Sequence, residues 1–171
     1  MVKMKRTDCF LPRIFFTAYA LLMLYLLFWQ RSSDAGSLSY VQALHAHLNL
    51  IPLRTIRAFA WLMRQGIRHG SVTLIRIALV NLLGNILMFI PLGFFLPLLW
   101  PKCRVFRRFL PTAAGIILIV ETVQLFTLLG RCDIDDLILN LPGAIMGYFI
   151  YRLTTAVRKR HFPPSQEIVH P

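Results

Sequence analysis

Long apolar runs separated by short polar and basic stretches dominate this chain of 171 residues. The runs cover residues 14–29, 72–100, 109–129 and 134–152. A helix rises ~1.5 Å per residue, so runs of this length are suited to cross the hydrocarbon core of a bilayer. The pattern predicts an all-α fold, an integral membrane bundle of four transmembrane helices.

Residues 54–69 have a different pattern, with helical period and two faces. One face is basic and the other apolar, which predicts an amphipathic surface helix lying in the bilayer interface. A solvated connector helix packed against the bundle is the alternative. The basic face carries Arg54, Arg57, Trp61, Arg64 and Arg68, and the apolar face carries Ile56, Phe59, Ala60, Met63 and Ile67.

Composition and charge agree with a membrane protein of one domain. The hydrophobic content is 57% and the formal net charge is +12, but the basic residues lie mostly at the ends of the apolar runs. They therefore act as topology signals rather than as a nucleic-acid surface. Twelve Lys and Arg residues fall on one side of the predicted bundle and six on the other, which places both termini in the cytoplasm.

The bundle is expected to cover residues 10–153 and to be followed by a basic, disordered cytoplasmic tail, residues 154–171. Cys9, Cys103 and Cys132 are widely spaced and form no C-x-x-C pattern, so neither a disulfide framework nor a zinc site is expected. No cofactor or resident metal is predicted.

Acidic side chains stand within or beside the last two apolar runs. Insertion of a charged side chain at such depth in a membrane costs roughly 2.5 to 3.5 kcal/mol per group, so charged residues there usually have a function. We predict a polar cleft open to the outer face. Glu121 and Gln124 form its floor, Asn81, Asn85 and Asn140 its walls, and Arg131, Asp133, Asp135 and Asp136 its rim.

Two plainer roles stay open for these residues. The amides and acids could only bind helices together, at ~0.6 kcal/mol per bond in measured membrane cases. The aspartates could instead cap a helix N-terminus, where negative charge is favourable. Close helix packing is the expected role of Gly84, Gly143 and Gly147, since small residues let helices approach.

The order of these motifs resembles the VanZ-like family of small bacterial membrane proteins. The resemblance rests on Asn49 to Pro52, Asn81-x3-Asn85-x5-Pro91-x-Gly93, Glu121-x2-Gln124, Arg131 to Asp136 and Asn140-x2-Gly143-x3-Gly147. It implies a four-helix protein of the bacterial cytoplasmic membrane, whose founding member lowers susceptibility to teicoplanin, a glycopeptide with a fatty acyl tail. Leu141-Pro142 departs from the family pattern, and a bend is expected in the last helix there.

Three functions are compatible with these features. The first is binding or altering an acylated or lipid-linked molecule at the outer leaflet, with membrane lipid as the partner. The second is an enzyme acting on a lipid-linked substrate, in which the acids supply general acid and base or hold a divalent cation. The third is a small transporter. The first is preferred because it fits both the acylated antibiotic linked to the family and the position of the polar residues. Against the enzyme, the chain has no Ser-His-Asp set, H-E-x-x-H motif or phosphate-binding glycine loop. Against the transporter, four helices in a monomer are few.

Overall fold

The computed structural model describes residues 10–29, 39–129 and 132–161, and almost all of these residues are helical. The predicted all-α fold is therefore confirmed. The helices are α1 (Phe10–Leu24), the π-helical turn η2 (Tyr25–Trp29), α2 (Tyr40–Ala46), α3 (Arg54–Arg68), α4 (Val72–Leu99), the 3-10 turn η3 (Pro101–Arg104), α5 (Phe106–Thr127) and α6 (Ile134–His161). Two short strands, β1 (Leu48–Asn49) and β2 (Cys132–Asp133), pair with each other.

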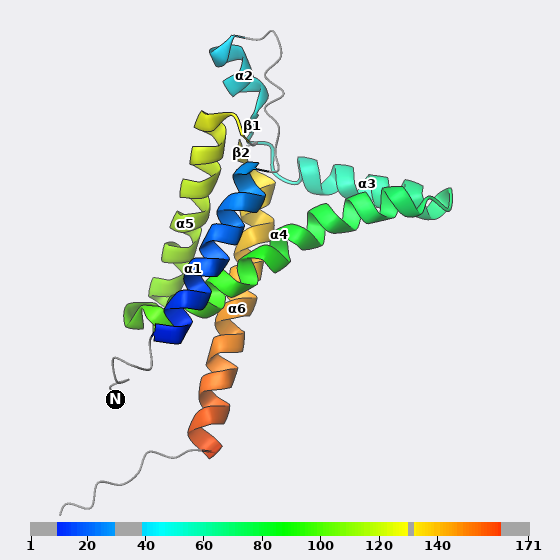
Figure 1. The fold of residues 1–171 in the computed structure, drawn as a ribbon. Helices are drawn as coiled ribbons and strands as arrows, with labels where there is room; N and C mark the ends of the chain where they lie inside the picture. Colours follow the sequence, from blue (N-terminus) through cyan, green and yellow to red (C-terminus); the bar gives the residue numbers. More distant parts are fainter. Residues whose placement is uncertain (1–9, 30–38, 130–131, 162–171) are drawn as a thin grey trace, which may run out of the picture.

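Three helices have roughly aligned axes, and a fourth crosses them. In Figure 1, α1 and α5 run upward and α6 runs downward, while α4 passes obliquely across the group. Helix α3 folds back on the first half of α4, and together they form a hairpin that projects to one side (Figure 1). We call this pair the α3–α4 hairpin. The strands β1 and β2 lie at the upper end of the bundle, where α5 ends and α6 begins.

Helices α4 and α6 make the most extensive contact, and their crossing is built on small residues. A Cβ atom at Gly143 would collide with the carbonyl oxygen of Ile86, and one at Gly147 with that of Ile90. From the other side, a Cβ at Gly93 would collide with the carbonyl of Ala144. The two backbones thus touch directly, as expected for small residues at a helix interface.

Gly84, the third glycine expected to serve packing, has a different environment. A Cβ added there would meet no atom within 4 Å, so this residue does not bring α4 close to a neighbour. Gly93 takes part in the crossing although its sequence context, between two prolines, suggests a helix break. Spacing shows that Gly84 and Gly93 lie on α4, but not which face of α4 meets α6.

An apolar core surrounds this crossing and is completed by α1 and α5. Tyr19 of α1 donates a hydrogen bond from its hydroxyl to the carbonyl of Met88 in α4 at 2.9 Å. The most buried apolar members are Phe89, Leu92, Leu96, Phe109, Ala113, Ile117, Ala144 and Tyr148.

Prolines do not end the helices that contain them. Helix α4 continues through Pro91 and Pro97 to Leu99. Likewise α6 is one continuous helix past Pro142. Membrane helices tolerate proline because neighbouring helices, or a local change in backbone conformation, provide partners for the backbone carbonyl that loses its hydrogen bond.

Three helices of the described residues are long and apolar enough to cross a membrane: Phe10–Leu27, Val72–Leu99 and Phe106–Thr127. They support a membrane protein, but four spans are not confirmed. The fourth predicted span corresponds to α6, which is long but less apolar, with acidic residues in its first turn and basic residues towards its end. It also extends to His161, so residues 154–161 of the expected disordered tail are helical, and residues 162–171 lie outside the described part.

The two glycine environments predict opposite effects of the same substitution. Gly147→Ala should destabilise the protein by about 1–3 kcal/mol, because its methyl group forces α6 away from α4. Gly84→Ala should be neutral or stabilise by up to about 1 kcal/mol, since alanine favours a helix more than glycine does. Thermal unfolding of both purified variants in detergent measures the difference. Equal melting temperatures would contradict the tight crossing.

Candidate functional site

The pairing of β1 with β2 assembles one end of the bundle, which we call the acidic end. The strands are parallel, with Leu48 opposite Cys132 and Asn49 opposite Asp133. In addition, the Cys132 N–H donates to the carbonyl of His47 at 3.0 Å. This short ladder ties the loop before α3 to the loop before α6, so the first residues of these two helices become neighbours.

Asp135 of α6 caps the start of α3. Its Oδ1 accepts a hydrogen bond from the Leu53 N–H, and its Oδ2 accepts from the N–H groups of Thr55 at 2.7 Å and Ile56 at 3.1 Å. Helix α3 has no side-chain cap of its own, because its N-cap residue is Leu53, held in a left-handed conformation with φ of 65°. The Asp135 side chain is fully buried. A carboxylate distant in the sequence therefore satisfies donors that a helix normally leaves open at its N-terminus.

Asp133 holds the same junction from the other side. Its Oδ1 accepts from the Asp135 N–H at 2.9 Å, which caps α6, and its Oδ2 accepts from the Thr55 hydroxyl. The Asn49 side-chain amide in turn donates to the Thr55 hydroxyl oxygen at 3.3 Å. Both aspartates thus act as helix caps, the second of the plainer roles left open by the sequence.

A second polar group lies next to these caps. Asn85 of α4 donates from Nδ2 to Oδ1 of Asp136 in α6 at 2.7 Å. Asn140 lies one turn further along the same face of α6, is 3% exposed, and its Oδ1 has no hydrogen-bond partner among the described residues. Glu121 of α5 is 4% exposed. We call Asn85, Glu121, Asp136 and Asn140 the acid–amide group.

The thiol of Cys132 reports the proximity of the acids. Its pKa is raised, first by burial and then by the negative charges of Glu121, Asp133 and Asp136. A carboxylate raises the pKa of a thiol only when the two groups are close to each other. Glu121 of α5 and Asp136 of α6 therefore both lie near Cys132 of β2. The sequence separates Glu121 from Asp136 by a helix end and a turn, and the fold brings both to one cysteine.

The other predicted site residues have separate places. Gln124 is buried and donates from Nε2 to the carbonyl of Leu27 at 3.1 Å, which ties α5 to η2. Asn81 is exposed and donates to the carbonyl of Ile77 in its own helix at 2.7 Å, so it lies outside the acid–amide group. Arg131 lies outside the described residues.

Five of the residues that were expected to line an open cleft are buried in the part of the chain that the structure describes. Glu121, Gln124, Asp133, Asp135 and Asn140 are each at most 7% exposed. Within residues 10–29, 39–129 and 132–161, no set of His, Cys, Asp and Glu side chains is arranged to hold a metal ion. Asp133 and Asp135 accept hydrogen bonds from donors at the two helix starts, whereas Asp136 accepts a hydrogen bond from Asn85 of α4.

Sequence reasoning did not assign a role to Thr55 or to Cys132. Thr55 is the first hydroxyl residue of α3, a position typical of a helix start, and this signal could have suggested a capping contact. Nothing in the sequence shows that the carboxylates which bind it come from β2 and the start of α6, some 80 residues later.

Removal of the cap at Asp135 should loosen the start of α3. In Asp135→Ala, three backbone N–H groups lose their acceptor, and each unsatisfied group costs about 1–3 kcal/mol. Hydrogen–deuterium exchange of residues 50–58 should therefore accelerate roughly tenfold or more, since 1.36 kcal/mol corresponds to a factor of ten. Asp136→Asn, which leaves these contacts in place, is the matched control. Unchanged exchange in Asp135→Ala would remove the capping role.

The acids around Cys132 should control its alkylation. In a protein with Cys9→Ser and Cys103→Ser, the rate of maleimide reaction should rise with pH around a midpoint above that of an ordinary cysteine, because the thiolate forms late. Glu121→Gln and Asp136→Asn each remove a nearby negative charge, so the midpoint should move to lower pH. Asn81→Ala, an exposed change on α4, should leave it in place. A midpoint indifferent to both acids would show that they do not converge on Cys132.

Comparison with known proteins identifies the family. The sequence model of the VanZ/LLP1 family matches residues 16–155, which extend from α1 into the last part of α6. No curated protein and no solved structure matches the chain. The matched segment includes the helix caps, the acid–amide group and the glycine crossing. The chain belongs to the VanZ/LLP1 family.

Proposed function

We propose that the chain crosses the cytoplasmic membrane of a bacterium four times, with α6 as the fourth span and the acidic end at the outer face. The beginning of α1 and the end of α6 lie toward the same end of the bundle, as an even number of crossings requires (Figure 1). That end carries Lys102, Arg104, Arg107, Arg108, Arg152, Arg158 and Arg160. We call it the basic end, and an excess of Lys and Arg is typical of the cytoplasmic side.

In this orientation the acid–amide group binds the polar part of an acylated or lipid-linked molecule at the outer leaflet. Asp133 and Asp135 are accounted for by the helix starts that they cap. Glu121 lies six residues before the end of α5, ~9 Å below its outer end, where a carboxylate is costly unless it serves a function. Asp136 and Asn85 offer a charged acceptor and an amide beside it.

The α3–α4 hairpin supplies the apolar surface that such a molecule needs. Trp61 and Ile67 of α3 are each more than 60% exposed, as is Val80 of α4, and Leu83 and Leu87 add to the same kind of surface. The basic face of α3 provides arginines for phosphate or headgroup contacts. An acyl chain lies along the hairpin while the polar part is bound at the acidic end.

One observation carries this proposal: two consecutive residues of α6 connect the two surfaces. Asp135 caps α3 and so fixes the base of the hairpin, while Asp136 bonds Asn85 within the acid–amide group. Recognition of an acyl chain and of its polar group therefore takes place at one junction. For a VanZ/LLP1 protein, the expected consequence is reduced susceptibility to an acylated glycopeptide such as teicoplanin. An enzyme is less well supported, because two of the four acids at this end are engaged as caps.

Antibiotic susceptibility tests the function. A sensitive bacterium that produces this chain should tolerate at least about fourfold more teicoplanin. Its tolerance of vancomycin, which lacks the acyl tail, should not change. The loss of one hydrogen bond to the bound molecule, about 1 kcal/mol, suffices to reverse a change of this size. Asp136→Asn keeps the shape and an acceptor oxygen but removes the charge, and should abolish the protection at equal membrane level.

The matched controls for this test lie one turn apart on α4. Asn85→Ala removes the partner of Asp136, whereas Asn81→Ala removes an exposed amide that bonds only its own helix. Protection should be lost in the first and kept in the second. Equal behaviour of the two variants, or of producing and empty strains, would refute the proposal. Retained protection in Asp136→Asn would assign the acid a purely helix-binding role.

A further inference from the structure

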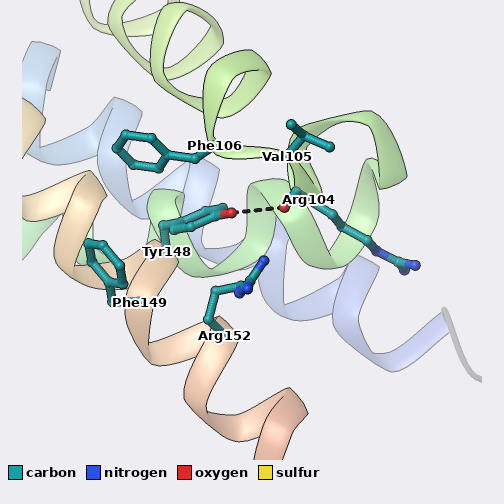
Figure 2. A pocket seen from close by; sticks show the side chains of 6 residues that line it. All are labelled: Arg104, Val105, Phe106, Tyr148, Phe149 and Arg152. Atoms are coloured by element: carbon teal, nitrogen blue, oxygen red, sulfur yellow. Dashed lines mark hydrogen bonds between the residues drawn. The ribbon is translucent and has the colours of Figure 1, made fainter.

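A hollow of about 360 Å³ lies at the basic end of the bundle, which is the end away from the acid–amide group. It is lined by Arg104, Val105, Phe106, Tyr148, Phe149 and Arg152 (Figure 2). These residues come from η3, from the start of α5 and from the middle of α6. The binding proposed at the acidic end does not involve any of them.

Tyr148 makes this hollow a preformed structure. Its side chain is 3% exposed, and its hydroxyl donates to the carbonyl of Arg104 at 2.8 Å, drawn as a dashed line in Figure 2. Its ring lies 4.6 Å from that of Phe109 and 5.3 Å from that of Phe106, measured between centroids. The contacts join α6 to η3 and α5, so the surface of the hollow is held by three elements.

Positive charge gathers at the hollow from three sources. Arg152 extends from α6 toward the end of the Tyr148 side chain, while the Arg104 guanidinium points outward (Figure 2). Arg104 is held by a bond from its Nε to the carbonyl of Pro97 at 3.2 Å. Helix α5 begins here after Val105 without a side-chain cap, so the positive end of its dipole is also present.

This charge has no acidic counterpart at the same end in the part of the chain that the structure describes. The described acids are Glu121, Asp133, Asp135 and Asp136, and all four belong to the acidic end. Apolar side chains flank the cations instead: Val105 is 53% exposed, Phe149 is 59% exposed and Leu153, one residue beyond Arg152, is 66% exposed. Cations beside exposed apolar groups match a molecule that has an anionic head and acyl chains.

We propose that the hollow binds the headgroup of an anionic phospholipid from the leaflet at the basic end. Arg152 contacts the phosphate, the start of α5 adds the field of its backbone dipole, and the acyl chains lie along Phe149 and Leu153. This site is independent of the proposed function at the acidic end, and the two can fail separately because one is measured by lipid binding and the other by drug susceptibility.

Native mass spectrometry of the full chain in detergent tests the site with added phosphatidylglycerol or phosphatidylcholine. Phosphatidylglycerol should be retained in preference to phosphatidylcholine, and Arg152→Gln should weaken its retention about fivefold to tenfold, because one charge-assisted contact is lost. Arg108→Gln is the matched control, since it removes the same charge from the same end but lies outside the lining of the hollow. It should change retention less than twofold. Arg152→Lys should keep most of the binding.

Three results would overturn the site. Equal losses in Arg152→Gln and Arg108→Gln would mean diffuse attraction to a basic surface. Equal retention of the two lipids, unaffected by Arg152→Gln, would mean that no charged headgroup is recognised. Displacement of phosphatidylglycerol by millimolar inorganic phosphate would assign the hollow to free phosphate. Thermal unfolding confirms in parallel that the variants are folded, which the exposed position of Arg152 leads us to expect.

Discussion

The structure depends on one buried carboxylate, that of Asp135, and on the backbone donors it accepts from. Burial of a polar side chain is costly unless it is hydrogen-bonded, and three N–H groups at a helix start provide those bonds here. Without this contact, α3 would begin at a left-handed leucine with no acceptor for its first donors. These hydrogen bonds tie the base of the α3–α4 hairpin to the start of α6. They also explain why an acid stands at the start of α6.

A second constraint is the direct contact of backbones where α4 crosses α6. Gly93, Gly143 and Gly147 permit it, and no side chain larger than hydrogen fits at these points. Because the two helices are held so closely, Asn85 and Asp136 come within a short hydrogen bond of each other near one end of the crossing. The position of the acid–amide group is thus a consequence of helix packing, and its chemistry depends on three residues that carry no functional group.

Charge is divided between the two ends of the bundle. The carboxylates gather around β2 and the start of α6, whereas the cations of η3, α5 and the later part of α6 lie at the opposite end. The proposed orientation in the membrane rests on this division, and so does the proposal that each end binds a different class of ligand. The acidic end offers acids and amides inside protein, and the basic end offers arginine beside exposed aromatic and aliphatic surface.

Much of the architecture follows from the sequence alone, because apolar runs and helical period are local properties. Residue spacing suffices for the all-α fold with helices apolar enough to cross a membrane, for the amphipathic helix at Arg54–Arg68 and for the small-residue face with Gly143 and Gly147. Residue spacing does not distinguish Asn85 from Asn81, or Gly93 from Gly84. All four residues lie on α4, and the two members of each pair differ in the parts of the structure that they contact.

Tertiary structure alone decides those differences. The direction in which α4 crosses α6 determines which of its faces is buried, and the parallel pairing of β1 with β2 brings Asp135 to a helix start some 80 residues away in sequence. Hydrogen bonds over such separations leave no periodic signal, because they depend on where whole helices end in space. The sequence by itself determined which segments are helices and which side chains are polar among apolar neighbours. Only the packed backbone decided that Asp133 and Asp135 cap helix starts, whereas Asp136 bonds Asn85 across the crossing of α4 and α6.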